Sequence, residues 1–193
     1  MPGARERLLQ AAIEYVASHG LGELSLRQLA TALGTSHRML VYHFGSKEDL
    51  LVAIIQAVEA RQRETLVELA GNAHLPVAEQ ARLMWQRLAD PAMWPHERLF
   101  FELYGQALQG RPGTEELLDG IVDAWLPFAT VALEALGMAH EEALAHARLG
   151  VAVTRGLLLD LLATRNREAV DAAMEAYIDL MERKLGSVLT EPD

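Results

Sequence analysis

The segment of residues 25–50 constrains the fold more than any other part of the chain. Apolar residues recur in its first ten positions with the i, i+3, i+4, i+7 spacing of a short amphipathic helix. Ser25 and Gln28 have the capping-box spacing at the start of this helix, and Gly34 stands where a chain leaving a helix often needs a positive φ. Ser36 can then cap a second short helix. Two short helices around a tight turn predict a helix-turn-helix, whose second helix enters the major groove of DNA.

The same segment resembles the signature of a known family. Gly34-Thr35-Ser36, then Leu40, then His43-Phe44-Gly45-Ser46-Lys47-Glu48-Asp49-Leu50 is similar to the DNA-binding motif of the tetracycline-repressor (TetR-like) transcriptional regulators. The resemblance covers about the first fifty residues. The family usually has Tyr directly after the Leu, whereas here that position is Val41 and Tyr42 follows. In the family that Tyr commonly touches the DNA backbone, so either the contact is lost or it has passed to Tyr42, about 100° around the helix.

Nine residues of this segment are candidate DNA contacts. Side chains at the start of the second helix can reach base edges, and the planar fork of Arg38 suits the paired acceptors of guanine. Lys47 opens the next helix, where backbone N–H groups favour an anion. For each candidate, the alternative is that the side chain is exposed on a helix surface and contacts only solvent. The candidates are Arg27, Thr35, Ser36, His37, Arg38, Met39, Tyr42, His43 and Lys47.

The net charge of −10 is unusual for a DNA-binding protein, but it is unevenly distributed. Residues 1–47 hold five basic and three acidic residues, a net +2, whereas the remainder holds 12 basic and 24 acidic residues, a net −12. Attraction to phosphate depends on the potential within about 8–10 Å. The acidic remainder therefore does not exclude DNA binding by residues 1–47. Because the positive charge of these residues is modest, we expect two copies of the chain to bind DNA together as a dimer.

The whole chain reads as helical, and nothing in it resembles an alternating strand. An all-α fold of about nine helices is expected, with a bend at Pro127. Residues 1–47 are interpreted as a three-helix DNA-binding domain, and residues 48–193 as an effector-binding and dimerisation domain. Besides the two motif helices, the expected helices cover residues 3–18, 47–70, 77–89, 96–110, 114–137, 141–163 and 167–185, of which 47–70 connects the two domains.

The last two helices carry wide apolar stripes. Ordinary packing within the chain is one explanation, and a four-helix bundle formed with a second copy is the other. The family resemblance implies a homodimer of this kind. The candidate interface residues are Val151, Leu158, Leu162, Met174, Tyr177, Ile178 and Met181.

Large side chains concentrate in the middle of the chain. Such residues at helical spacing are usually core, yet together with a few polar groups they can line an apolar cavity. The family resemblance implies a small-molecule effector of unknown identity in this region. The candidate lining residues are Met84, Trp85, Leu88, Phe101, Tyr104, Trp125, Phe128 and Arg155.

Several classes of function are disfavoured by what the sequence lacks. There is no cysteine, and His140 and His146 are six residues apart rather than the four of a zinc helix. No nucleophile elbow or phosphate-binding glycine loop is present, so we expect no enzyme, cofactor or metal. No signal-peptide pattern and no apolar run of about 20 residues is present, so we expect a cytoplasmic protein without membrane segments.

These features predict a homodimeric, ligand-responsive transcriptional regulator, most consistent with a repressor. It would bind a palindromic double-stranded DNA operator and be released by a small-molecule effector. The alternative is a helical effector-binding or enzymatic domain that retains a non-functional helix-turn-helix. Val41 and the small positive charge of residues 1–47 are the observations that favour this alternative.

Overall fold

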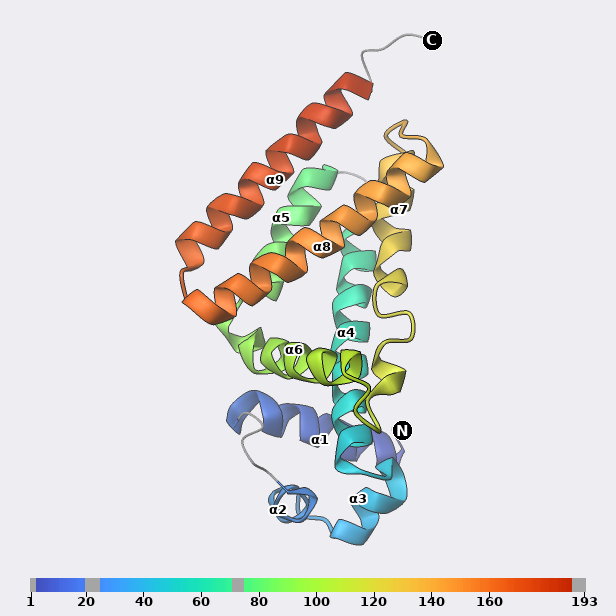
Figure 1. Cartoon of the computed structure of the whole chain (residues 1–193), viewed down its shortest axis with the longest axis vertical. Coiled ribbons are helices and arrows are strands. Elements are labelled where there is room, and N and C mark those ends of the chain that lie inside the picture. Colours follow the sequence, from blue (N-terminus) through green and yellow to red (C-terminus); the bar gives the residue numbers. More distant parts are fainter. Residues whose placement is uncertain (1–2, 20–24, 71–74, 189–193) are drawn as a thin grey trace. The chain divides into compact units, whose positions relative to one another are not determined.

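The computed structural model describes residues 3–19, 25–70 and 75–188 (Figure 1). Within these residues every regular element is a helix, so the expected all-α class is confirmed. The α-helices are α1 (Ala4–His19), α2 (Leu26–Ala32), α3 (His37–Phe44), α4 (Lys47–Ala70), α5 (Val77–Leu88), α6 (Trp94–Leu108), α7 (Leu126–Glu134), α8 (His140–Thr164) and α9 (Arg167–Val188). Three 3₁₀ turns join them: η1 (Pro91–Met93), η2 (Glu115–Leu117) and η3 (Asp123–Trp125).

The described chain separates into two compact units that are interleaved in sequence. The first unit comes from residues 1–61 and 91–119, and the second from residues 62–90 and 120–193. The single helix α4 contributes to both units, and α6 belongs to the first. Compactness does not assign function, so the predicted functional division between residues 47 and 48 stays a prediction.

The first unit packs the helix-turn-helix on the apolar faces of α1 and α4. Ala12, Ile13 and Val16 of α1 are buried, as are the apolar positions of α2 that the sequence spacing predicts. Leu50 and Ile54 of α4 are completely buried. Helix α6 packs against α1 and buries His96, whose ring nitrogens make no hydrogen bond of ordinary geometry within the described residues.

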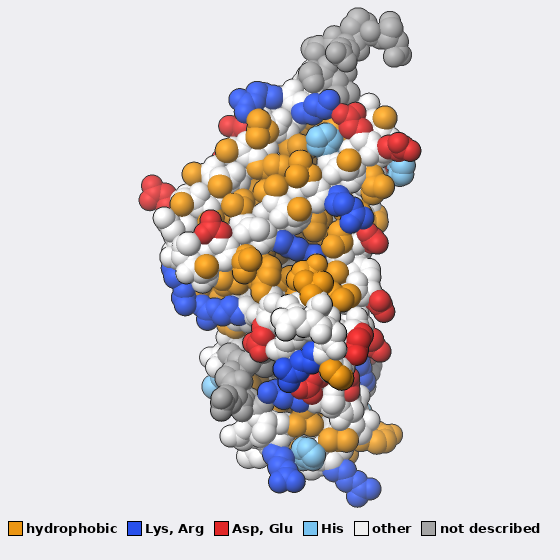
Figure 2. Space-filling view, viewed as in Figure 1, with side chains coloured by type: hydrophobic (Ala, Val, Ile, Leu, Met, Phe, Trp, Pro, Cys, Tyr) orange, Lys and Arg blue, Asp and Glu red, His pale blue; other side chains and the backbone are white. Residues whose placement is uncertain are grey.

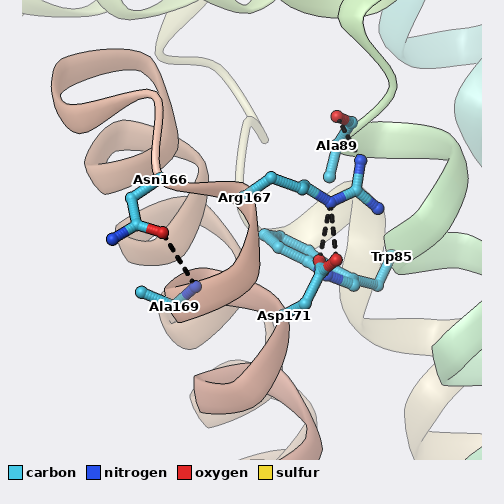
Figure 3. Close-up of polar contacts among 6 residues, drawn as sticks. All are labelled: Trp85, Ala89, Asn166, Arg167, Ala169 and Asp171. Atoms are coloured by element: carbon cyan, nitrogen blue, oxygen red, sulfur yellow. Dashed lines mark hydrogen bonds and ion pairs between the residues drawn. The ribbon is translucent and has the colours of Figure 1, made fainter.

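The second unit packs α7 on α8, α8 on α9, and α5 on α9. A polar network holds α5 to the start of α9 (Figure 3). The indole N–H of Trp85 donates to Asp171 Oδ1 at 2.6 Å, and Arg167 Nε donates to both oxygens of the same carboxylate at 2.7 and 2.8 Å. Arg167 also donates to the backbone carbonyl of Ala89, directly after α5, at 2.8 Å. One carboxylate thus serves two donors from two helices.

One predicted helix is wrong. Residues 114–137 do not form a single bent helix; instead η2 and η3 precede a nine-residue α7. Gly120 has φ +66°, which interrupts helical geometry, and Pro127 lies in the first turn of α7 rather than in the interior of a helix. In a first turn the missing N–H of proline costs no hydrogen bond, so Pro127 helps to start the helix that we expected it to bend.

Candidate nucleic-acid interface

Local hydrogen bonds define both ends of α2. Ser25 Oγ accepts from the backbone N–H of Gln28, and the Gln28 side chain accepts from the backbone N–H of Ser25 at 2.8 Å. At the other end Gly34 adopts φ +65°, and Thr35 N–H donates to Ala30 O at 2.9 Å. This is the pattern of a Schellman motif, which ends a helix sharply. The predicted capping box and glycine turn are confirmed.

Helix α3 shows one face to the core and the opposite face to solvent. Ser36 caps it by accepting from Met39 N–H at 3.2 Å, as predicted. Leu40 and Phe44, one turn apart, are buried and hold α3 on the unit. Arg38 and Tyr42, also one turn apart, are exposed on the other side. The core contacts therefore determine which side chains α3 can present to a partner.

A second capping box joins α3 directly to α4. Gly45 has φ +86°, Ser46 N–H donates to Asp49 Oδ2 at 2.8 Å, and Asp49 N–H donates to Ser46 Oγ at 3.0 Å. Lys47 is half-exposed as the first residue of α4. Because Asp49 already occupies the first turn of α4, an approaching anion would be attracted mainly by the Lys47 ammonium rather than by the end of this helix.

The other predicted contacts differ in how accessible they are. Arg27, Ser36 and His37 are exposed, and Thr35 is half-exposed. His43 is half-exposed, but its Nε2 atom is buried, so a phosphate contact through that atom would require the ring to turn. In Figure 2, basic and histidine side chains lie at the end of the first unit where Figure 1 shows α2 and α3. Whether these residues touch DNA stays a prediction.

Two arginines beside this surface were not among the predicted contacts. The Arg5 guanidinium lies 5.1 Å from the centre of the Phe44 ring, which brings the start of α1 to the end of α3. Arg111, after α6, lies 3.6 Å from the Glu48 carboxylate in the first turn of α4. Arg111 thus offsets a negative charge next to Lys47. Neither contact leaves a local sequence signal, because each joins residues about 40 or more positions apart.

The predicted effector residues are divided between the two units. Phe101 and Tyr104 are half-exposed on α6 in the first unit. The others belong to the second unit, where Met84, Trp85 and Leu88 of α5 are buried.

Trp125, Phe128 and Arg155 are half-exposed in the second unit. Trp125 has a buried indole nitrogen without a hydrogen-bond partner among the described residues, and the Arg63 guanidinium lies 5.6 Å from the centre of its ring. Arg155 donates to the backbone carbonyl of Ile121 at 2.6 Å.

The predicted dimer residues differ in how deeply they are buried. Leu158, Met174 and Ile178 are buried within the second unit, and the remaining four are half-exposed. The apolar side chains most accessible on these two helices include Leu159 of α8 and Leu180 of α9, neither of which is among the seven candidate interface residues.

Comparison with known proteins gives relatives for this fold. Residues 8–54, which span α1 to the first turns of α4, match the family described as bacterial regulatory proteins, tetR family. The chain is 35% identical over 65 residues to the HTH-type transcriptional repressor AcnR of Corynebacterium efficiens, covering 34% of this chain and 35% of that protein. It is 30% identical over 114 residues to the HTH-type transcriptional regulatory protein RaaS of Mycobacterium tuberculosis, covering 46% and 53%. The chain thus spans about a third to a half of the length of these curated relatives.

The fold similarity extends over nearly the whole chain. A transcriptional regulator from Rhodococcus sp. RHA1 superposes with a TM-score of 0.76 at 21% identity, covering 94% of this chain and 97% of that one. Fold and site together define an all-helical protein of the helix-turn-helix class. By sequence, the similarity to the tetR family of bacterial regulatory proteins lies in residues 8–54, and the rest of the chain shares its fold with solved structures of low sequence identity. Within the described residues, no helix has the length and apolar character needed to cross a bilayer.

Proposed function

We propose that this protein is a homodimeric repressor that binds a palindromic DNA operator through α3 and is released by a small-molecule effector. The observation that carries the proposal is the arrangement of α3, whose Leu40 and Phe44 are buried while Arg38 and Tyr42 face solvent. A helix held in this way can lie in a major groove with its outer side chains on base edges and phosphates. The intact caps at both ends of α2 and at the start of α3 and α4 disfavour a non-functional helix-turn-helix.

Selection of bound duplexes from a random DNA pool tests DNA binding. We expect an enriched palindrome with half-sites about 34–36 Å apart, the spacing of one turn of DNA. Arg38→Ala should relax base preference at one position per half-site, because it removes a guanine contact worth about 1–3 kcal/mol. Lys47→Ala should weaken binding to every sequence and reduce the salt dependence. An unenriched pool would favour the alternative of a non-functional motif.

The sequence of α8 and α9 supports the dimer. On α8, exposed Leu149, Ala152, Gly156 and Leu159 follow each other at intervals of three or four residues, so they form one stripe along the helix. On α9, the exposed alanines and Leu180 are spaced in the same way. Figure 2 shows hydrophobic side chains gathered over these helices. Small residues allow two copies of such a helix pair to approach closely and form a four-helix bundle.

The oligomeric state can be measured by light scattering after size-exclusion chromatography. We expect a dimer for the wild type and a monomer for Leu159→Glu, because the new carboxylate would be buried unpaired at the interface. Leu108→Glu is the matched control, since Leu108 is also exposed but lies on α6 in the first unit. If Leu159→Glu remains a dimer that binds its operator normally, the proposed interface is wrong.

For the effector, we propose a site in the second unit beside Trp125. Its indole N–H has no hydrogen-bond partner in the part of the chain that the structure describes, so it can donate to a ligand, and Phe128 and Arg155 supply apolar and polar surface within the same unit. A small-molecule panel screened by thermal shift should yield a ligand that raises the melting temperature and releases the operator. Such a ligand shifts the equilibrium only by its difference in affinity for the two states. Trp125→Phe should then weaken that ligand without changing operator affinity in its absence.

A further inference from the structure

The outer face of α3 carries an unusual amount of apolar surface. Ten large hydrophobic side chains are exposed in the described residues, and three of them, Met39, Val41 and Tyr42, lie on this eight-residue helix. The exposed fractions of Met39 and Val41 are 40% and 41%. Single exposed apolar residues are common, but three of them on one short helix that also carries cationic side chains indicate a surface with a partner. Here the flanking charges, Arg38 and Lys47, require that partner to be anionic.

The exposed side chains of α3 differ in the groups of DNA that they can contact. Tyr42 is the most exposed, at 78%, and its phenol can donate to a phosphate oxygen. Val41 has no polar atom, so it can contribute neither a phosphate contact nor a hydrogen bond to a base. The apolar group that a B-DNA major groove offers is the C5-methyl of thymine. A branched aliphatic side chain is suited to contact that methyl and to exclude water from it.

The spacing from Arg38 sets where this thymine should be. Val41 follows Arg38 by three residues, so the two side chains are neighbours on the helix surface, with Cβ atoms about 5–6 Å apart. Successive bases on one strand are about 3.4 Å apart. A side chain beside Arg38 therefore reaches a base within one or two positions of the one that Arg38 contacts.

We propose that Val41 is a specificity-determining residue that reads the methyl group of a thymine within two base pairs of the guanine read by Arg38. This inference rests on the proposed DNA-binding function. It also explains the departure from the family pattern at this position. The family's tyrosine can bind a phosphate, whereas the valine that follows Leu40 here can distinguish one base from another.

The test replaces single thymines of the selected operator by deoxyuridine, which removes the methyl and leaves the base-pairing and hydrogen-bonding groups unchanged. At one thymine per half-site, wild-type affinity should fall about fourfold, the effect of exposing one methyl-sized group, and about fifteenfold when both half-sites are changed. Val41→Ala should bind the thymine and deoxyuridine operators within twofold of each other. Val67→Ala, a similarly exposed valine of α4 that belongs to the second unit, should keep the wild-type discrimination.

The outcomes separate this inference from the function on which it rests. A selection that enriches no sequence overturns both. An enriched operator that tolerates deoxyuridine at every thymine, or that has no thymine near the guanine read by Arg38, overturns the role of Val41 and leaves DNA binding intact. Discrimination that persists in Val41→Ala but is lost in Met39→Ala assigns the methyl contact to Met39 instead. Far-UV circular dichroism verifies that each variant is folded.

Discussion

The carboxylate of Asp171 offers a quantitative test of what holds α5 to α9 (Figure 3). In Asp171→Ala, the Trp85 indole N–H loses its acceptor, and Trp85 is only 5% exposed. A buried donor left without a partner costs about 1–3 kcal/mol. The ion pair with Arg167 is about two-fifths exposed on both sides and spans one helical turn, so it adds about 0.3–0.5 kcal/mol. We therefore expect Asp171→Ala to lower the free energy of unfolding by about 2 kcal/mol.

A double-mutant cycle isolates the hydrogen bond to the indole. In a Trp85→Phe background the donor is already absent, so adding Asp171→Ala should cost only about 0.5 kcal/mol. The difference, about 1.5 kcal/mol, is the coupling between the two side chains. Asp179→Ala serves as the control, since it removes an exposed carboxylate from the same helix and should change stability by no more than about 0.5 kcal/mol.

The assay is urea unfolding followed by far-UV circular dichroism at one fixed protein concentration, because dimerisation would make the midpoint concentration-dependent. Equal m-values among the four proteins show that the same surface is exposed in each. The reasoning is refuted if Asp171→Ala costs as much in the Trp85→Phe background as in the wild type. It is also refuted if Asp171→Ala is no more destabilising than Asp179→Ala.

Three further outcomes follow from the first unit. Burial lowers the pKa of His96, and this effect is larger than the opposing effect of the Ile13 backbone. Below the ordinary histidine pKa of about 6.5, the unfolded chain therefore binds a proton that the folded chain excludes. Stability should therefore be full above that pH and fall below it, and urea midpoints between pH 8 and 5 should drop less for His96→Leu than for the wild type. Gly113→Ala, at φ +83° with the new Cβ 3.1 Å from a Glu48 carbon, should lose about 1–2 kcal/mol in thermal denaturation, whereas Gly105→Ala, inside α6 with open space around it, should gain about 0.5–1 kcal/mol. Tyr42→Phe should weaken operator binding about five- to tenfold on every sequence, through loss of a hydrogen bond to phosphate, and an effect confined to some sequences would contradict that role.

The helix-turn-helix was predictable because its determinants are local. The capping boxes at Ser25 and Ser46 connect residues three apart, and the turn at Gly34 is completed by bonds that reach back three to five residues. Such contacts leave a signature in a short stretch of sequence. The predicted limits of α4 agree with the structure for the same reason.

The failures concern long-range packing. Apolar spacing continues through residues 114–137, yet the chain there forms two 3₁₀ turns with a positive φ at Gly120 between them before α7 begins. On α8 and α9 the stripes are apolar on two sides, and spacing alone cannot say which side packs inward. The structure buries Leu158 and leaves its neighbour Leu159 accessible, a difference decided by the contacts of α8 with α7 and α9.

The interleaving of the two units limits how such a protein can be recombined. A chimera that grafts residues 1–47 onto another body would take α1, α2 and α3 but leave behind α6, which supplies buried side chains to the same unit. The graft would expose the face of α1 that α6 covers and would omit the Arg111 partner of Glu48. A DNA-binding unit that can be transferred must therefore comprise residues 1–61 together with residues 91–119 as a second inserted segment. New operator specificity is more readily obtained by changing side chains on α3 than by exchanging the end of the chain that carries it.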